Sequence, residues 1–249
     1  MKFKLLLALL ILSTQSKAET INIAVAANVS YAIDTLKKEF NTLYPDTKVQ
    51  VTLGSSGKLT AQIKNGAPYQ LFMSANMKYP IALYKEKIAI TKPHIYAQGS
   101  LAFLSVKKRN YCAEMDILKE KDIYKIAIAN PKTAPYGIAT AEAIKNYGIY
   151  ESIKDKFVYG ESISQTVSYA VTAADIGIIA KSALYSPNMK QFNEAIHWSE
   201  VDSKLYTPIS QGIVILKAGK NNTQVKAFYD FILSKRSKKI FEDFGYQIP

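Results

Sequence analysis

The fold is decided by the stretch INIAVAANVS, residues Ile21–Ser30, which predicts a buried strand followed at once by a polar turn. Its first part is short and almost wholly apolar, as in a parallel strand that is covered on both faces. Asn28 and Ser30 are favoured N-cap residues, so we expect a helix from about Tyr31 to Phe40. A helix that begins at the carboxyl end of a buried strand directs free N–H groups and a positive dipole end to that place, which suits an anion.

The same pattern of strand, turn and helix recurs along the chain. A second strand at Lys48–Leu53 is followed by the turn Gly54–Gly57 and by a helix that ends before Asn65-Gly66. Further strands are expected at Gln70–Ser74, Leu101–Val106, Lys125–Ala129, Phe157–Tyr159, Ile176–Ala180 and Tyr206–Leu216, and further helices at Tyr79–Lys87, Ile138–Tyr147, Ile163–Val171 and Thr223–Leu233. This alternation predicts an α/β fold with largely parallel sheets.

Residues 1–18 have the features of a secretory signal peptide. Lys2 and Lys4 are followed by an unbroken apolar run, Leu5–Leu12, and by small residues at Ser16-Lys17-Ala18. An uncleaved membrane anchor is the alternative, but the run is well below the roughly 20 residues that a spanning helix needs. The rest of the chain is long enough for one large domain or for two lobes of about 100 residues each.

Composition excludes some classes of protein. Cys112 is the only cysteine, so the chain forms no intrachain disulfide and no thiolate metal cluster; we expect it to be partly buried. The formal net charge of +12, or +9 after loss of the signal peptide, favours anionic partners through long-range steering. The basic residues are scattered apart from Lys107–Arg109 and Lys235–Lys239, and no nucleic-acid partner is predicted.

The turn Gly54-Ser55-Ser56-Gly57-Lys58 is not a nucleotide-binding loop. A P-loop requires a glycine where this chain has Thr52, and a serine or threonine where it has Leu59. What remains is a hydroxyl-bearing turn at the start of a helix. It can present hydroxyl and N–H groups to a ligand, or it can be an ordinary helix cap.

The sequence does not favour an enzyme. There is no G-x-S-x-G elbow, and only His94 and His197 could serve as imidazole bases. Both histidines are expected to be structural. No spacing of histidine, cysteine or carboxylate residues matches a zinc site, so no metal cation and no cofactor are predicted.

Three motifs together resemble one known family. They are Ala26–Val29, Ser55–Leu59 continuing into Asn65–Ala75, and Asn130–Gly137. In this order and spacing they are similar to those of the periplasmic molybdate-binding components of ABC importers, which are type II solute-binding proteins. The resemblance covers Ile21–Ile248, nearly the whole chain after the signal peptide.

The resemblance implies an α/β fold of two lobes, each a mostly parallel sheet flanked by helices. We expect lobe one to comprise residues 19–92 and 216–249, and lobe two residues 93–215 with the crossing strands. The expected ligand is molybdate or tungstate, held in the cleft between the lobes of a periplasmic, monomeric receptor. That receptor would deliver the anion to a membrane ABC permease.

Carried over by position, the oxyanion contacts of the family correspond to Asn28, Ser56, Tyr136 and Ile163. Asn28 and Ser56 would use their side chains, Ile163 its backbone N–H, and Tyr136 either its backbone N–H or its phenol. Some relatives have a further tyrosine where this chain has Ala180, which removes a hydroxyl donor. The metal would be bound only as its oxyanion and not as a cation.

None of these positions carries an acid or a base, although Lys58 is close by. A dianion held by neutral donors and helix N-termini avoids the desolvation penalty of a buried ion pair. A pocket made only of donors also selects against a protonated oxyanion such as hydrogen phosphate, whose O–H would lack an acceptor. Molybdate, tungstate and sulfate all satisfy this requirement. The alternatives are therefore a sulfate or other oxyanion receptor and, from another class, a secreted hydrolase with a nucleophilic serine.

Overall fold

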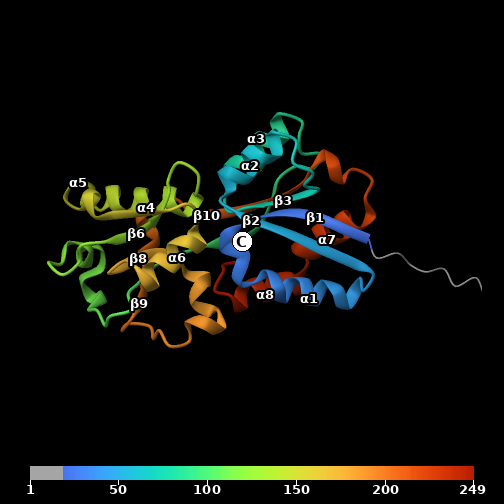
Figure 1. Ribbon diagram of the computed structural model, residues 1–249. Coiled ribbons are helices and arrows are strands. Elements are labelled where there is room, and N and C mark those ends of the chain that lie inside the picture. The colour runs from blue at the N-terminus through green and yellow to red at the C-terminus, as the bar shows by residue number, and fades with distance from the viewer. Residues whose placement is uncertain (1–18) are drawn as a thin grey trace, which may run out of the picture.

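The computed structural model describes residues 19–249, so the expected signal peptide lies outside the described residues. The chain forms two lobes placed side by side, and each is built on a five-stranded sheet with helices on its faces (Figure 1). This is the two-lobed α/β architecture that the family resemblance implies. No helix among residues 19–249 combines the length and the apolar character needed to span a membrane.

The strands are β1 Glu19–Ala26, β2 Thr47–Gly54, β3 Leu71–Ser74, β4 His94–Gly99, β5 Leu101–Leu104, β6 Ile126–Ala129, β7 Phe157–Gly160, β8 Ile176–Ala180, β9 Trp198–Glu200 and β10 Ile209–Ile215. The α-helices are α1 Ile33–Leu43, α2 Ser56–Lys64, α3 Lys78–Lys85, α4 Pro135–Asn146, α5 Tyr150–Ile153, α6 Ile163–Thr172, α7 Thr223–Leu233 and α8 Lys235–Asp243. Short 3-10 helices connect several of them, including Ala27–Tyr31 after β1 and Tyr111–Lys119 after β5.

The first sheet has the strand order β2-β1-β3-β10-β4. β1 is parallel to β2 and to β3, and Ile23 lies opposite Val51 on one side and Leu71 on the other. Because these three strands run in the same direction, their carboxyl ends meet at one edge of the sheet. The chain turns into a helical segment after each of them at that edge.

The second sheet has the order β7-β6-β8-β5-β9 and repeats this arrangement. β6 is parallel to β7 and to β8, so the turns that lead into α4 and α6 also lie at one edge. β5 is antiparallel to its two neighbours, β8 and β9, and in the first sheet β10 is antiparallel to β3. Both sheets are therefore mixed, and each contains three parallel strands.

The two lobes are joined by strands and not by a flexible tether. The chain passes from the first sheet to the second between β4 and β5 at Ser100, and it returns between β9 and β10. The sequence analysis grouped residues 94–99 and 209–215 with lobe two, but they pair with each other in the first sheet, where residues 209–215 also pair with β3. The exact lobe boundaries stay a prediction.

Three local expectations were wrong. α1 begins at Ile33 with Ala32 as its N-cap residue and no side-chain cap, so Asn28 and Ser30 do not cap it. The chain first makes a 3-10 turn, and the Asn28 side chain is bonded to residues far away in the sequence. α4 begins at Pro135 and not at Ile138, which places Tyr136 in its first turn. Cys112 is exposed and not partly buried.

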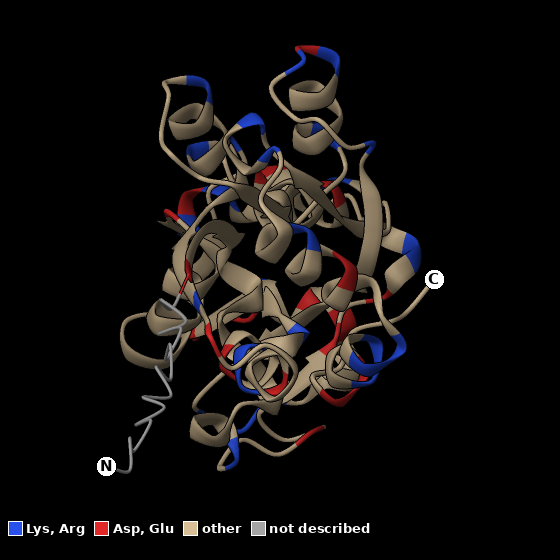
Figure 2. Ribbon diagram, turned by 90° about the vertical axis from the view of Figure 1, so that its right-hand side faces the viewer, with Lys and Arg blue, Asp and Glu red and all other residues tan. Residues whose placement is uncertain are grey.

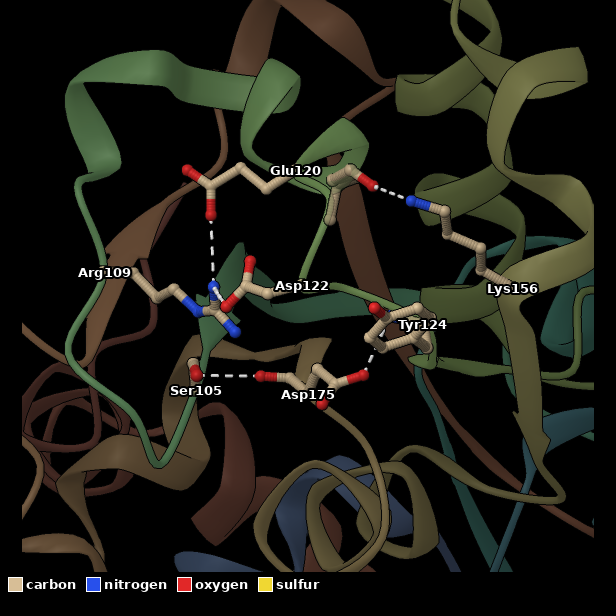
Figure 3. A network of polar contacts seen from close by, with 8 residues as sticks. Ser105, Arg109, Glu120, Asp122, Tyr124, Lys156 and Asp175 are labelled. Carbon is tan, nitrogen blue, oxygen red and sulfur yellow. Dashed lines mark hydrogen bonds and ion pairs between the residues drawn. The ribbon is translucent and has the colours of Figure 1, made fainter.

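Charged side chains lie mainly on the periphery. The positions of Lys and Arg are spread over several helices and loops in the view of Figure 2. One polar network closes the outer end of the second lobe: the buried Arg109 guanidinium pairs with Glu120 and Asp122 (Figure 3). Asp175 accepts hydrogen bonds from the backbone N–H groups of Tyr124 and Lys125 beside it. This network attaches the long loop after β5 to the sheet.

An aromatic cluster holds α1 and α7 to the first sheet. Phe40 and Phe228 are fully buried and meet edge to face with their ring centroids 5.0 Å apart. Such pairs add a directional contribution to the apolar burial. The cluster therefore fixes the helices that cover one face of the sheet.

We expect Phe228→Ala to lower the free energy of unfolding by about 3–5 kcal/mol, because it removes a buried ring and leaves a cavity. Leu43→Ala is the matched control on α1, and its side chain is about half exposed (49 %). The control should stay within about 0.5 kcal/mol of the parent. Urea unfolding followed by circular dichroism measures both. Equal effects of the two variants would show that the cluster is not central to stability.

Candidate functional site

A small cavity lies between the lobes, where the strand ends of the two sheets face each other. The space is small, which suits a small ion and not a sugar or a peptide. The lining residues come from five chain segments and are Ala26, Ala27, Asn28, Gly54, Ser55, Ser56, Ala75, Ala134, Pro135, Tyr136 and Ile163. All four residues that the sequence analysis singled out are brought together here. Their role as ligand contacts stays a prediction.

Three α-helices begin at this cavity: α2 at Ser56, α4 at Pro135 and α6 at Ile163. The N–H groups of Ser56, Tyr136 and Ile163 have no hydrogen-bond partner among residues 19–249. Each helix start is equivalent to roughly half a positive charge. Together the three can balance most of the charge of a dianion without a cationic side chain.

The serine turn supplies two buried hydroxyl groups, those of Ser55 and Ser56. Ser55 is the N-cap residue of α2, but its hydroxyl does not cap the helix and is buried without any partner. The hydroxyl of Ser56 already accepts a hydrogen bond of 2.9 Å from the backbone N–H of Ala75. Because Ser56 Oγ only accepts this bond, its own proton has no acceptor among residues 19–249, and both serine hydroxyls can donate to a ligand. Ser55 is the one that the sequence analysis did not single out. The two adjacent serines were its only signal, and the local pattern does not tell which one faces inward.

Asn28 lies at the first turn, fully buried. Its Nδ2 donates to Gln211 Oε1 at 2.8 Å and to the Tyr246 hydroxyl at 3.0 Å. Its Oδ1 is buried and has no partner. Gln211 and Tyr246 were not expected, because both are far away in the sequence.

Tyr136 offers its backbone N–H to the cavity and uses its phenol elsewhere. The hydroxyl accepts a hydrogen bond of 3.2 Å from Gln211 Nε2 and lies against Gly99, where an added Cβ would be only 1.9 Å away. Burial, followed by the neighbouring Tyr246 and Tyr96 phenols, raises the pKa of Tyr136 well above its usual value. The phenol is therefore neutral at any physiological pH.

No side chain that is charged at neutral pH lines the cavity. The cation nearest in the sequence, Lys58, forms an ion pair with Glu161 of the other lobe, and both side chains are more than half exposed. An exposed ion pair of this kind contributes little to the stability of the protein. His94 and His197 do not line the cavity, and His197 Nδ1 accepts a hydrogen bond from the Asn193 N–H. Within residues 19–249 there is no cluster of histidine, cysteine and carboxylate side chains that could hold a metal ion.

The lobes touch across the cavity through polar contacts. The Gly57 N–H donates to Thr133 O at 2.9 Å, and the Ser164 hydroxyl donates to Ala27 O at 2.7 Å. Because these bonds join α2 to the α4 turn and α6 to the turn after β1, they require the lobes to be close together. The structure is thus a closed form.

Comparisons with known proteins agree with this geometry. A family model described as bacterial extracellular solute-binding protein matches residues 21–247. The molybdate-binding protein ModA of Azotobacter vinelandii is 32% identical over 240 residues, covering 95% of this chain and 93% of the relative. ModA of Rhodobacter capsulatus is 34% identical over 228 residues, covering 90% and 86%. The structure of the periplasmic molybdate-binding protein of Azotobacter vinelandii superposes with a TM-score of 0.84 at 28% identity, covering 92% of this chain and 99% of that one.

The two serines should differ in their effect on stability. Ser56→Ala leaves the buried N–H of Ala75 without an acceptor, so we expect a loss of about 1–3 kcal/mol in the free energy of unfolding. Ser55→Ala removes a hydroxyl without a partner, so the free energy of unfolding should be unchanged or slightly higher. Chemical unfolding of both variants without added anion measures this difference. A larger loss for Ser55→Ala than for Ser56→Ala would contradict the hydrogen bonding described for the two hydroxyls.

Proposed function

The chain belongs to the bacterial extracellular solute-binding proteins, and from that membership we propose that it is a receptor for molybdate. The closed cavity between its lobes would hold the anion. The observation that carries this proposal is the meeting of three helix N-termini and the Ser55 hydroxyl in a cavity without a charged side chain. The matching family model is described as one of bacterial extracellular solute-binding proteins.

The donors fit a fully deprotonated tetrahedral oxyanion. The N–H groups of Ser56, Tyr136 and Ile163 and the Ser55 hydroxyl are all free to donate. Fixed dipoles of this kind stabilise an anion without the desolvation penalty of a buried lysine or arginine. Tungstate has the same charge and shape as molybdate, so we extend the proposal to it.

Closure of the lobes is the second part of the proposal. A ligand shifts the equilibrium toward the closed form only if it binds that form better. Donors from both lobes meet at the cavity, so the anion is fully surrounded only after closure. The closed receptor would act as a monomer in the periplasm and would present both lobes to a membrane ABC permease.

Titration calorimetry with molybdate, tungstate, sulfate and hydrogen phosphate tests the proposal. We expect one-to-one binding of the first two, weaker binding of sulfate, and much the weakest binding of hydrogen phosphate, whose proton would lack an acceptor. Ser55→Ala is the matched variant and should weaken molybdate binding by about tenfold, the value of one charge-assisted hydrogen bond. Tight binding of sulfate with no response to molybdate would favour the alternative receptor. No binding of any oxyanion would refute the proposal.

Ser164 should contribute to affinity through closure. Its hydroxyl bonds to Ala27 O of the other lobe, and no described contact places it on the cavity lining. Ser164→Ala should therefore weaken molybdate binding by about threefold to tenfold. Ser168→Ala is the control, because Ser168 lies one turn later on α6 and its hydroxyl donates only to Ser164 O in the same helix. Equal affinities for the two variants would show that this contact between the lobes does not stabilise the bound state.

A further inference from the structure

Gln211 is the centre of a fully buried hydrogen-bond network beside the cavity. It lies on the crossing strand β10 at a β-bulge, next to Gly212. Its Oε1 accepts from Asn28 Nδ2 and from the Tyr96 hydroxyl, each at 2.8 Å. Its Nε2 donates to the Tyr136 hydroxyl at 3.2 Å. One side chain therefore links Asn28 of the first lobe to Tyr136 of the second.

Two groups in this network are left without a partner. Asn28 Oδ1 is buried and accepts no hydrogen bond. The Tyr136 hydroxyl accepts from Gln211, and its own proton has no acceptor among residues 19–249. A buried polar group without a partner is costly, and an unpaired carbonyl oxygen beside an anion is also repelled by it.

We propose that Gln211 is a positioning residue that sets the direction of the Asn28 amide, and that both amides are reversed in the oxyanion-bound protein. This inference rests on the proposed function. Reversal exchanges the places of nitrogen and oxygen in each amide and moves no other heavy atom. Asn28 then presents Nδ2 to the anion as a donor, and its Oδ1 accepts from Gln211 Nε2.

The rest of the network adapts to the reversal with the loss of one hydrogen bond, the one that the Tyr246 hydroxyl accepts from Asn28 Nδ2 at 3.0 Å. The Tyr136 hydroxyl donates to Gln211 Oε1 and so gains the acceptor that it lacked. Gln211 Nε2 donates to the Tyr96 hydroxyl, whose own proton turns to Ser74 O, 3.4 Å away. Tyr246 keeps its bond of 2.8 Å to Asn28 O. Burial raises the pKa of Tyr246 to about 12 and that of Tyr96 well above its usual value, so these phenols keep the protons that the network needs.

The direction of the Asn28 amide decides which anions are accepted. With Nδ2 toward the cavity, the site consists of donors and suits a fully deprotonated oxyanion. With Oδ1 toward the cavity, it offers an acceptor to the proton of hydrogen phosphate. Gln211 can hold the first arrangement because an amide carries a donor and an acceptor side by side. Neither a carboxylate nor an apolar side chain can do so.

Nuclear magnetic resonance of the labelled full chain saturated with sodium molybdate tests the reversal. The side-chain amide of Gln211 is assigned from its loss in Gln211→Met. In the reversed network its protons lie beside the Tyr96 ring, and nuclear Overhauser effects to that ring are expected. Effects to the Tyr136 ring instead would overturn the inference. Calorimetry on the same sample distinguishes a failure of this inference from a failure of the proposed function. If the protein binds no molybdate, the proposed function itself is refuted.

The selectivity of Gln211→Met provides a second test. With Asn28 free to present either atom, molybdate binding should weaken at least about tenfold, and its preference over hydrogen phosphate should fall by a similar factor. Gln98→Met is the matched control, because Gln98 lies on the neighbouring crossing strand and donates only to the Ser210 hydroxyl. The control should change neither the molybdate affinity nor the preference over hydrogen phosphate by more than about twofold. A purely structural Gln211 would lower both affinities equally, and an unchanged preference would contradict the proposal.

Discussion

The structure depends on one electrostatic constraint: three helix N-termini meet at one buried point that has no charged side chain. Aligned positive dipole ends repel one another, and their free N–H groups are costly to bury. The arrangement becomes favourable when an anion occupies the point. The positions of the sheets, the crossing strands and the turns all serve to bring α2, α4 and α6 to the same place.

Close backbone packing gives these helix starts their position. An added Cβ at Gly137, in the first turn of α4, would lie 2.2 Å from Ala129 O at the end of β6. The helix start is therefore pressed against the strand that precedes it, and only glycine allows this approach. At Gly57 an added Cβ would lie 2.8 Å from Thr133 O of the other lobe. Glycine at that position lets the lobes close until their backbones meet.

Local patterns in the sequence predicted the α/β fold, the family resemblance implied its two lobes, and the candidate residues chosen in this way lie around one cavity. A buried strand, a polar turn and a helix are adjacent in the chain, and parallel strands bring such turns to one edge. The role of Asn28 as a cap was wrong, because its side chain is bonded to Gln211, 183 residues away. Ser55 and Gln211 were missed for the same reason. The direction in which a hydroxyl or an amide points is set by tertiary partners that no local pattern contains.

Anomalous diffraction at the molybdenum absorption edge, from crystals grown with molybdate, tests the central claim most directly. The account predicts one strong peak inside the cavity, within hydrogen-bonding distance of the Ser55 hydroxyl and of the N–H groups of Tyr136 and Ile163. A peak at surface lysines such as those of α8, with the cavity empty, would contradict it. The convergence of the helices would then serve the packing of the lobes and not the binding of an anion.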